Sequence, residues 1–413
     1  MTKQVLCTAP LTAALIDTNK GVRPCCVYSE EYIGNIKEER LINIINGAEW
    51  KKIKEQMYAN EWPVPCLSCK EREDVTGWSV RTLFSDGSFD VDGWEQEKLT
   101  YLEFNGSNIC NLACLHCTPG FSSRWVIDNK KAKAIFDTYD QEIKDKIHYF
   151  DAVSFYTDDK LGRSTKMHLP NPELVLENLK DLDLSNLRTI NFKGGEPLLN
   201  SETLAILNHL DELSILGNVS IILSSNGTYV NQEIIDVFKK CKKITFNLSL
   251  DGIDELFNYI RYGDAKFIDI EPVIAKLNVL TNISVQFQVS IMNYNIFNLE
   301  EIREWGVKMS EKYSVVHNVT GFSNCVQYPK YLSLQTLSDD TRKELIAYYN
   351  NLRYSTHYET VIKALEAEYI GDDIHDDWVH YTNLMQTVRG NNILSIVPQL
   401  AKELKFNKKA NNG

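Results

Sequence analysis

From residue 100 to about residue 320, short apolar or β-branched segments alternate with longer amphipathic ones. The short segments have the length of buried strands, and the long ones have the periodicity of helices that pack one face against a core. Such alternation is typical of a parallel α/β sheet, because parallel strands need a crossover between them. The expected strands span 100–104, 189–193, 219–224, 244–250, 283–291 and 314–319, and the expected helices span 200–213, 231–240, 270–280 and 299–312. Six strands are too few for a closed eight-stranded barrel.

The segments on either side of this region have a different pattern. Residues 11–17 and 22–28 flank a turn at Asn19-Lys20-Gly21, which predicts a hairpin, and residues 38–60 predict one or two helices. The Gly- and Asp-containing stretch 85–93 is expected to be a connector, with a domain boundary near residue 95. Beyond about residue 330 the pattern is helical and polar. We therefore expect three parts, at 1–95, 96–325 and 326–413.

Charge and hydropathy exclude some classes of function. The chain has 413 residues and a net charge of −12, which argues against a general nucleic-acid binder because such proteins cluster Lys and Arg. No segment approaches the roughly 18 to 20 consecutive apolar residues that cross a bilayer, and the N-terminus lacks the features of a secretory signal. We therefore expect a cytoplasmic protein with no membrane or nucleic-acid partner.

Eight of the ten cysteines lie in the first 117 residues. Disulfide frameworks belong to small secreted chains, whereas grouped cysteines in a larger chain from a reducing compartment more often bind metal or do redox chemistry. One group is Cys7, Cys25, Cys26, Cys66 and Cys69, and the other is Cys110, Cys114 and Cys117. The remaining two, Cys241 and Cys325, are isolated in the sequence.

The spacing of Cys110, Cys114 and Cys117 directly after an expected strand indicates a metal site. Three thiolates on one short loop can bind three irons of a 4Fe-4S cluster and leave the fourth iron open. An open coordination position is typical of catalytic centres, while structural metal sites are closed. Zinc, with His116 or a distant residue as the fourth ligand, remains an alternative on spacing alone.

With these motifs the sequence resembles the radical S-adenosylmethionine (SAM) superfamily, whose three-cysteine loop follows the first strand of a partial (β/α)6 barrel. His116 occupies the position before the last cysteine, where the family has an aromatic or His residue. Further motifs follow the later expected strands in the family's order, at the carboxyl ends where parallel sheets bind ligands. By this resemblance the cofactor-binding residues are His116, Gly194, Gly195, Glu196, Asn226, Ser249, Asp251, Arg261 and Asn293, and Cys110, Cys114 and Cys117 bind the catalytic cluster.

The first cysteine group is expected to form a second metal site. Cys66 and Cys69 flank a two-residue spacer, and Cys7 with one of Cys25 and Cys26 would complete four ligands. The segment 17–36 resembles the hairpin of twitch and SPASM domains, which bind auxiliary 4Fe-4S clusters, and this resemblance favours Cys25. In most relatives the module follows the barrel, whereas here it precedes it. Zinc is the alternative, because four thiolates form a closed site that suits it equally well.

The resemblance implies an enzyme that cleaves SAM reductively to a 5′-deoxyadenosyl radical, which abstracts hydrogen from a substrate. A peptide or protein side chain is the expected substrate, because auxiliary-cluster modules most often accompany peptide modification. The electron donor would be a flavodoxin or a ferredoxin. Oxidation or rearrangement of a small molecule such as an amino sugar is the alternative, and a non-catalytic iron-sulfur or zinc protein for electron transfer or sensing is the alternative from another class. His317 is a weaker candidate for substrate contact, and Cys325 is a weaker candidate for a third-cluster ligand or a donor that quenches a radical.

Overall fold

The computed structural model describes the chain except for residues 1–5, 30–31, 87–93, 147–166, 318–321 and 405–413. Its centre is an eight-stranded sheet with the order β3-β2-β1-β4-β5-β6-β7-β8 among the described residues. Strands β4 to β8 are parallel neighbours, as the alternating pattern predicts. The strands are β1 Ala13–Ile16, β2 Gly21–Arg23, β3 Gly34–Asn35, β4 Tyr101–Phe104, β5 Thr189–Phe192, β6 Ser220–Ser225, β7 Lys243–Ser249 and β8 Ile283–Gln288.

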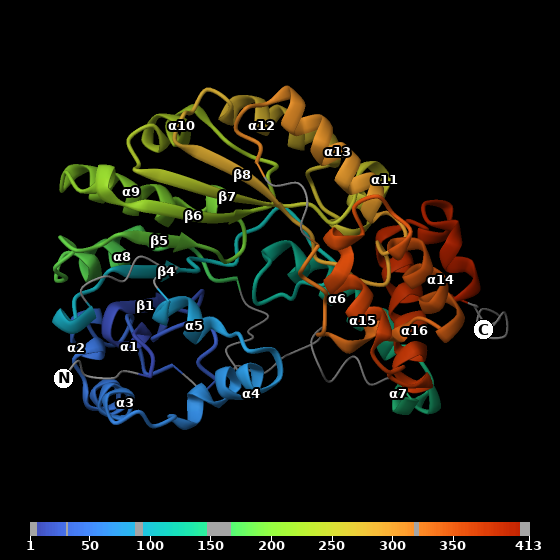
Figure 1. Cartoon of the computed structure of the whole chain (residues 1–413), viewed down its shortest axis with the longest axis horizontal. Helices are drawn as coiled ribbons and strands as arrows, with labels where there is room; N and C mark the ends of the chain where they lie inside the picture. The colour runs from blue at the N-terminus through green and yellow to red at the C-terminus, as the bar shows by residue number, and fades with distance from the viewer. Residues whose placement is uncertain (1–5, 30–31, 87–93, 147–166, 318–321, 405–413) are drawn as a thin grey trace.

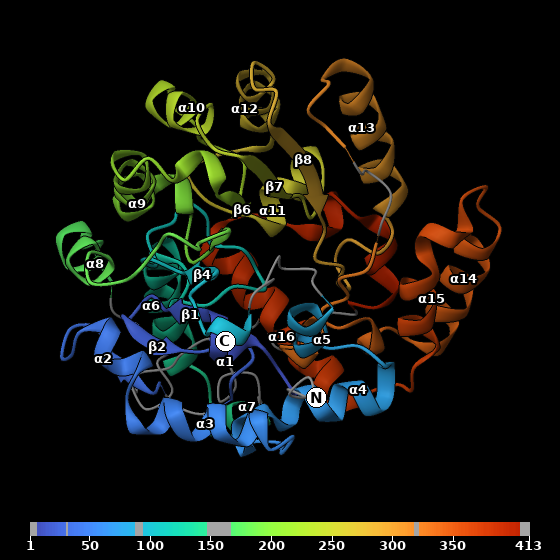
Figure 2. The same ribbon diagram turned by 60° about the vertical axis from the view of Figure 1, so that its left-hand side comes forward.

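The sheet curves, and the helices that connect its parallel strands lie along its convex, outer face, as in a partial barrel (Figure 2). Burial alternates along β7, where Ile244, Phe246 and Leu248 belong to the main core while Thr245 and Asn247 are only half-buried. Because side chains alternate between the faces of a strand, apolar residues pack outward on the helices and polar residues face inward. The outer helices are α8 Pro172–Leu179, α9 Ser201–Glu212, α10 Gln232–Phe238, α12 Ile270–Leu277 and α13 Leu299–Lys312.

The N-terminal segment extends this sheet. Strands β1 and β2 form the predicted antiparallel hairpin, and β1 also pairs in parallel with β4, the first barrel strand. The buried Lys20 reinforces the junction, because its ammonium donates to the carbonyl of Gly106 and pairs with Glu202 at 2.6 Å. The boundary expected near residue 95 therefore falls within one continuous sheet. The helices of this segment are α1 Ala9–Thr12, α2 Leu41–Ile45, α3 Ala48–Tyr58, α4 Leu67–Thr76 and α5 Val80–Ser85.

The C-terminal segment is helical, as expected, and lies beside the open side of the barrel (Figure 1). It contains α14 Asp339–Asn350, α15 Glu359–Glu366 and α16 Asp372–Arg389. Helix α16 contacts α6 Ser123–Asp137, which follows the three-cysteine loop and precedes α7 Gln141–Lys146. Helix α11 Asp254–Ile260 follows β7. No helix in the described part of the chain is both long and apolar enough to cross a membrane.

One expected strand differs from the structure. The segment 314–319 was expected to be the sixth barrel strand, but in its described residues only Val316 pairs, through an isolated bridge to Val285 of β8. The amide of His317 adds one hydrogen bond to the carbonyl of Val285. This pairing is too short to make a strand, and residues 318 and 319 of the expected strand lie outside the described residues. The described part of the barrel therefore has five strands, and the hairpin extends its other edge.

Candidate cluster and cofactor site

A cavity of about 580 Å³ opens at the carboxyl ends of β4 to β7. This volume is in the range of about 300 to 1,000 Å³ that is usual for small-molecule sites. The residues that line it come from the cysteine loop, from the turns after the strands and from the N-terminal hairpin. They include Cys110, Cys114, His116, Cys117, Gly194, Gly195, Asn226, Ser249 and Arg261 of the predicted site, together with Arg23, Cys26, Glu103, Asn105, Thr118, Phe121, Lys193 and Tyr328.

The three-cysteine loop is tied on one side to the segment that follows β7 and α11. Leu112 forms an antiparallel bridge with Gly263, and the amides of Ala113 and Leu115 donate to the carbonyls of Tyr262 and Ile260 at 2.6 and 2.9 Å. These bonds hold the backbone of the loop against the end of α11 and the residues that follow it. They fix the direction in which its cysteines project.

Three consecutive carbonyls of the loop are also occupied, by side chains from two helices. Arg389 of α16 donates to the carbonyl of Ala113 at 2.6 Å, and Trp125 of α6 donates to the carbonyl of Cys114 at 2.6 Å. Tyr381 of α16 donates to the carbonyl of Leu115 at 2.9 Å. The C-terminal helix thus positions the backbone of the cysteine loop, although it lies more than 260 residues away in the sequence. A lone Arg or Tyr on a helix carries no signal by which the sequence could reveal this.

Of the three loop cysteines, Cys114 is buried and Cys110 and Cys117 are half-buried, and one cation lies beside Cys114. Burial raises the pKa of Cys110 to about 12 and also raises the pKa values of Cys114 and Cys117. Arg261 lies with Nη1 3.6 Å from Cys114 Sγ and Nη2 2.8 Å from Asp251 Oδ2. Buried thiols ionise only when positive charge compensates them, and bound iron supplies that charge. The donor set therefore suits an iron-sulfur cluster.

A single zinc ion suits the loop less well. Among the described residues, no three His, Cys, Asp or Glu side chains gather closely enough to hold one metal ion. In a 4Fe-4S cluster each thiolate binds a different iron, so the sulfurs need not converge on one point as they do around zinc. The arrangement of Cys110, Cys114 and Cys117 around a cavity is consistent with a cluster.

Gly194 and Gly195 cross directly over the chain that leads into the cysteine loop. A Cβ on Gly194 would lie 1.7 Å from the carbonyl oxygen of Asn105, and one on Gly195 would lie 2.2 Å from that of Ile109. Gly194 also has a φ of +111°, which L-residues rarely adopt. Only glycine fits these two positions, and the close approach leaves backbone exposed to the cavity.

Three predicted cofactor-binding residues are absent from the cavity lining. The carboxylate of Glu196 accepts from the Ser225 hydroxyl at 2.8 Å and the Asn226 amide at 2.7 Å, so it joins the turns after β5 and β6. Asp251 is fully buried and pairs with Arg261. Glu196 therefore positions Asn226, and Asp251 positions Arg261, and these two partners line the cavity.

Asn293 was predicted to bind the cofactor, but it does not line the cavity. Its side-chain amide donates to the carbonyl of Tyr331 and to the hydroxyl of Thr336, at 2.8 and 2.9 Å. It therefore joins the turn after β8 to the C-terminal segment. His317 is exposed and Cys325 is half-buried, and neither lines the cavity.

The second cysteine group surrounds a separate, small cavity of about 20 Å³. Cys7, Cys25, Cys66 and Cys69 all line it, and burial raises the pKa of Cys7 to about 12. Cys66 directly precedes α4, and Cys69 lies in its first turn. Four thiols around one cavity are a suitable donor set for an iron-sulfur cluster. Cys26 lines the large cavity instead, so the neighbours Cys25 and Cys26 face different cavities.

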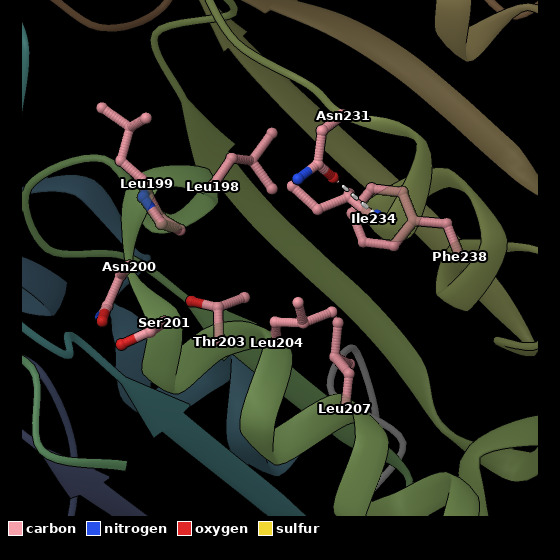
Figure 3. Close-up of a pocket in the computed structure, with 11 residues that line it drawn as sticks. Leu198, Leu199, Asn200, Ser201, Thr203, Leu204, Leu207, Asn231, Ile234 and Phe238 are labelled. Carbon is pink, nitrogen blue, oxygen red and sulfur yellow. Dashed lines mark hydrogen bonds between the residues drawn. The ribbon is translucent and has the colours of Figure 1, made fainter.

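A third cavity, of about 180 Å³, lies between α9 and α10 on the outer face of the sheet (Figure 3). Its lining is mostly apolar, with Leu198, Leu204, Leu207, Ile234 and Phe238. No predicted site residue lines it. This cavity therefore plays no part in the site.

Two family models match the chain. The radical SAM superfamily model matches residues 104–305, and the iron-sulfur cluster-binding SPASM domain model matches residues 7–70. Together with the three-cysteine loop and the glycine turn on one cavity, they place the chain in the radical SAM superfamily, with the SPASM-type module N-terminal to the barrel. This is a superfamily of enzymes whose cofactors are SAM and a 4Fe-4S cluster, and the module adds an auxiliary iron-sulfur cluster. No curated protein matches the sequence.

Several solved structures resemble the fold at low identity. Native anSMEcpe with bound AdoMet is 17% identical, over 65% of this chain and 63% of that chain, with a TM-score of 0.39. Streptococcus suis SuiB bound to precursor peptide SuiA is 15% identical, over 77% and 61%, with a TM-score of 0.34. The radical SAM methyltransferase TsrM from Kitasatospora setae is 11% identical, over 55% and 35%, with a TM-score of 0.34. The matched region thus spans less than two thirds of these chains, and the family assignment rests on the two family models.

Proposed function

We propose that this protein reductively cleaves SAM and uses the resulting radical to abstract hydrogen from a peptide or protein side chain. The observation that carries the proposal is that Cys110, Cys114 and Cys117 line one cavity with the close-packed Gly194 and Gly195. When bound, the cluster and SAM supply a 5′-deoxyadenosyl radical. The three cysteines would hold the cluster, and the cavity is large enough for a cofactor and part of a substrate.

The chain's own residues orient and shield this chemistry. Asn226 lines the cavity, and its side-chain amide donates to Asn111 Oδ1 at 2.8 Å, so it fixes the turn after β6 against the cysteine loop. Ser249 and His116 line the same cavity from β7 and the loop. Burial lowers the pKa of His116, partly opposed by Asp251, whose carboxylate lies 3.7 Å from His116 Nε2. A neutral His116 adds no positive charge beside the thiols, which leaves Arg261 as the cation closest to Cys114.

The peptide or protein substrate is supported by the SPASM-type module, which matches residues 7–70. Cys7, Cys25, Cys66 and Cys69 would hold the auxiliary cluster, whose position next to the cavity would let it take up an electron from the substrate radical. The electron donor would be a flavodoxin or a ferredoxin. Oxygen-labile clusters and free thiols fit the reducing cytoplasm.

The test is anaerobic reconstitution, followed by counting of iron and sulfide and by reduction with dithionite in the presence of SAM. We expect about eight irons per chain and formation of 5′-deoxyadenosine. Cys114→Ala should abolish this product, whereas Cys241→Ala, which removes a buried thiol on the outer side of the sheet, should retain it. Zinc in place of iron, or equal product from Cys114→Ala, would refute the proposal.

A further inference from the structure

One end of the large cavity is built from polar residues that the cofactor motifs do not include. Strand register places Arg23 of β2, Glu103 of β4 and Asn191 of β5 in one row across the sheet, with Leu15 of β1 between the first two. Paired residues on neighbouring strands point to the same face. The row therefore lies on the concave face.

A second row lies one step nearer the carboxyl ends. Asp17, Asn105 and Lys193 each follow by two residues a position of the first row, so they share its face. The ladder continues through them, because the amide of Asn105 donates to Ile16 and that of Lys193 donates to Phe104. Arg23, Glu103, Asn105 and Lys193 all line the cavity. The pairing of β1 with β4 is what brings Asp17 and Arg23 to the barrel.

We call Asp17, Arg23, Glu103, Asn105 and Lys193 the polar surface of the cavity, and its two acids and two bases form two ion pairs. Arg23 pairs with Asp17 at 2.7 Å, and Lys193 pairs with Glu103 at 3.1 Å. Two acids and two bases that already neutralise one another favour a neutral, dipolar ligand group over a carboxylate or an ammonium. The ammonium of Lys193 has three N–H groups and its side chain is 38% exposed, so it can donate to a ligand as well as to Glu103.

Asn105 supplies the complementary acceptor. Its Nδ2 donates to Asp17 Oδ1 at 3.2 Å, and because a carboxylate only accepts, the amide orientation is fixed. Asp17 is itself held by Arg23 and by the hydroxyl of Tyr32. Asn105 is 93% buried and lines the cavity, and its Oδ1 has no hydrogen-bond partner among the residues that the structure describes. A buried acceptor without a partner costs free energy that a donor from a ligand would recover.

We propose that the polar surface of the cavity is a substrate subsite that binds an amide group. The amide N–H donates to Asn105 Oδ1, and the amide carbonyl accepts from the Lys193 ammonium. The amide belongs either to a peptide backbone unit or to the side chain of Asn or Gln, and both have the required donor and acceptor. This inference deepens the proposed function, on which it rests, by assigning the end of the cavity that receives the peptide.

The test measures binding of small probes to the cluster-loaded protein with SAM, by saturation-transfer NMR under anaerobic conditions. N-acetylglycine N-methylamide represents the backbone unit, butyramide represents the side-chain amide, and methyl butyrate is the ester control without an N–H. We expect one or both amides to bind and the ester to bind at least about fivefold more weakly, the loss of one buried hydrogen bond. The tighter of the two amides identifies the source.

Variants locate the subsite. Lys193→Met and Asn105→Leu should each weaken amide binding about fivefold or more, whereas Lys239→Met, which removes an exposed ammonium of the turn after α10, should not. Lys193 is partly exposed, so its variant tests the subsite even if Asn105→Leu fails to fold. Equal binding of ester and amides, or amide binding unchanged in Lys193→Met, would overturn the inference.

The amide-binding result can be distinguished from the result of the test of the proposed function. Formation of 5′-deoxyadenosine by the wild-type protein tests radical initiation without any probe. Amide binding without 5′-deoxyadenosine would overturn the proposed function and retain the subsite. Formation of 5′-deoxyadenosine without amide binding would do the reverse.

Discussion

The bond from Arg389 to the cysteine loop predicts that the C-terminal helix stabilises the cluster site, and Arg389→Met tests this. The guanidinium donates to Ala113, pairs with Asp128 at 3.1 Å and lies about 5 Å from the ring centroids of Trp125 and Tyr262. Its side chain is 1% exposed, so solvent does not screen these interactions.

The magnitude follows from what the variant leaves behind. Breaking a buried ion pair costs about 3 to 5 kcal/mol when the remaining charge is uncompensated. Asp128 keeps a second partner, Arg124, at 3.0 Å, so the lower end applies and we expect a loss of about 3 kcal/mol in the free energy of unfolding. With a urea m-value of at least about 3 kcal/mol/M for a chain of this size, the midpoint should fall by up to about 1 M.

The assay is urea unfolding of the metal-free protein followed by circular dichroism, together with iron content after reconstitution. Arg303→Met is the matched control, because Arg303 pairs with Glu300 three residues earlier on α13, and that pair should contribute at most about 1 kcal/mol. Iron content should fall in Arg389→Met and not in the control. Equal midpoint shifts for the two variants, or full iron content in Arg389→Met, would refute the reasoning.

Three other predictions follow from single contacts. Cys66→Ala should lose about four of about eight irons while Cys26→Ala keeps all of them, and equal iron counts would contradict the assignment of Cys26 to the large cavity. Gly195→Ala should abolish 5′-deoxyadenosine formation because its Cβ would lie 2.2 Å from the Ile109 carbonyl oxygen. The control Gly217→Ala, whose Cβ would have its nearest atom at 3.7 Å, should stay active. Activity in both variants would show that the backbone around Gly195 can move to accept a Cβ. Burial raises the pKa of Cys241 to about 12 from 9.0, so the wild-type protein should lose stability relative to Cys241→Ala as pH rises above 9, by about 1 kcal/mol at pH 10; urea midpoints that stay parallel would contradict this.

The barrel strands were predictable because their pattern is local. Residues 244–250 alternate in a way that indicates which face packs on helices, and β7 occupies 243–249. For the expected sixth strand at 314–319, the described residues show only the bridge from Val316 to Val285 of β8, and a short apolar segment does not reveal by itself whether it has partners. The parallel pairing of β1 with β4 joins segments almost 90 residues apart and leaves no mark in either one.

In the candidate site, too, features with a local sequence signal were predictable and features that depend on distant partners were not. The thiol spacing and the paired glycines are local signals, and the structure brings them to one cavity. The expectation for Asn293 relied on its position after a strand, but its amide bonds to a segment about 40 residues later. Arg389 and Tyr381 were missed because their partners are backbone carbonyls, which every residue has. Glu103 and Lys193 had a usable signal, since polar residues that alternate with apolar ones along 101–105 and 189–193 indicate a polar inner face.

The pairing of β1 with β4 joins the SPASM-type module to the barrel, although the module precedes the barrel in the sequence. Because β1 is parallel to β4, the chain leaves both strands at the same edge, where the cysteine loop and the glycine turn also lie. The hairpin then turns back through β2, and Cys25 and Cys26 follow it directly. Consecutive Cα atoms are about 3.8 Å apart, so one peptide unit separates the thiol that lines the auxiliary cavity from the thiol that lines the large one. Because β2 is antiparallel to β1, Cys25 and Cys26 lie toward the beginning of β1 and β4, and Cys26 reaches the large cavity from there.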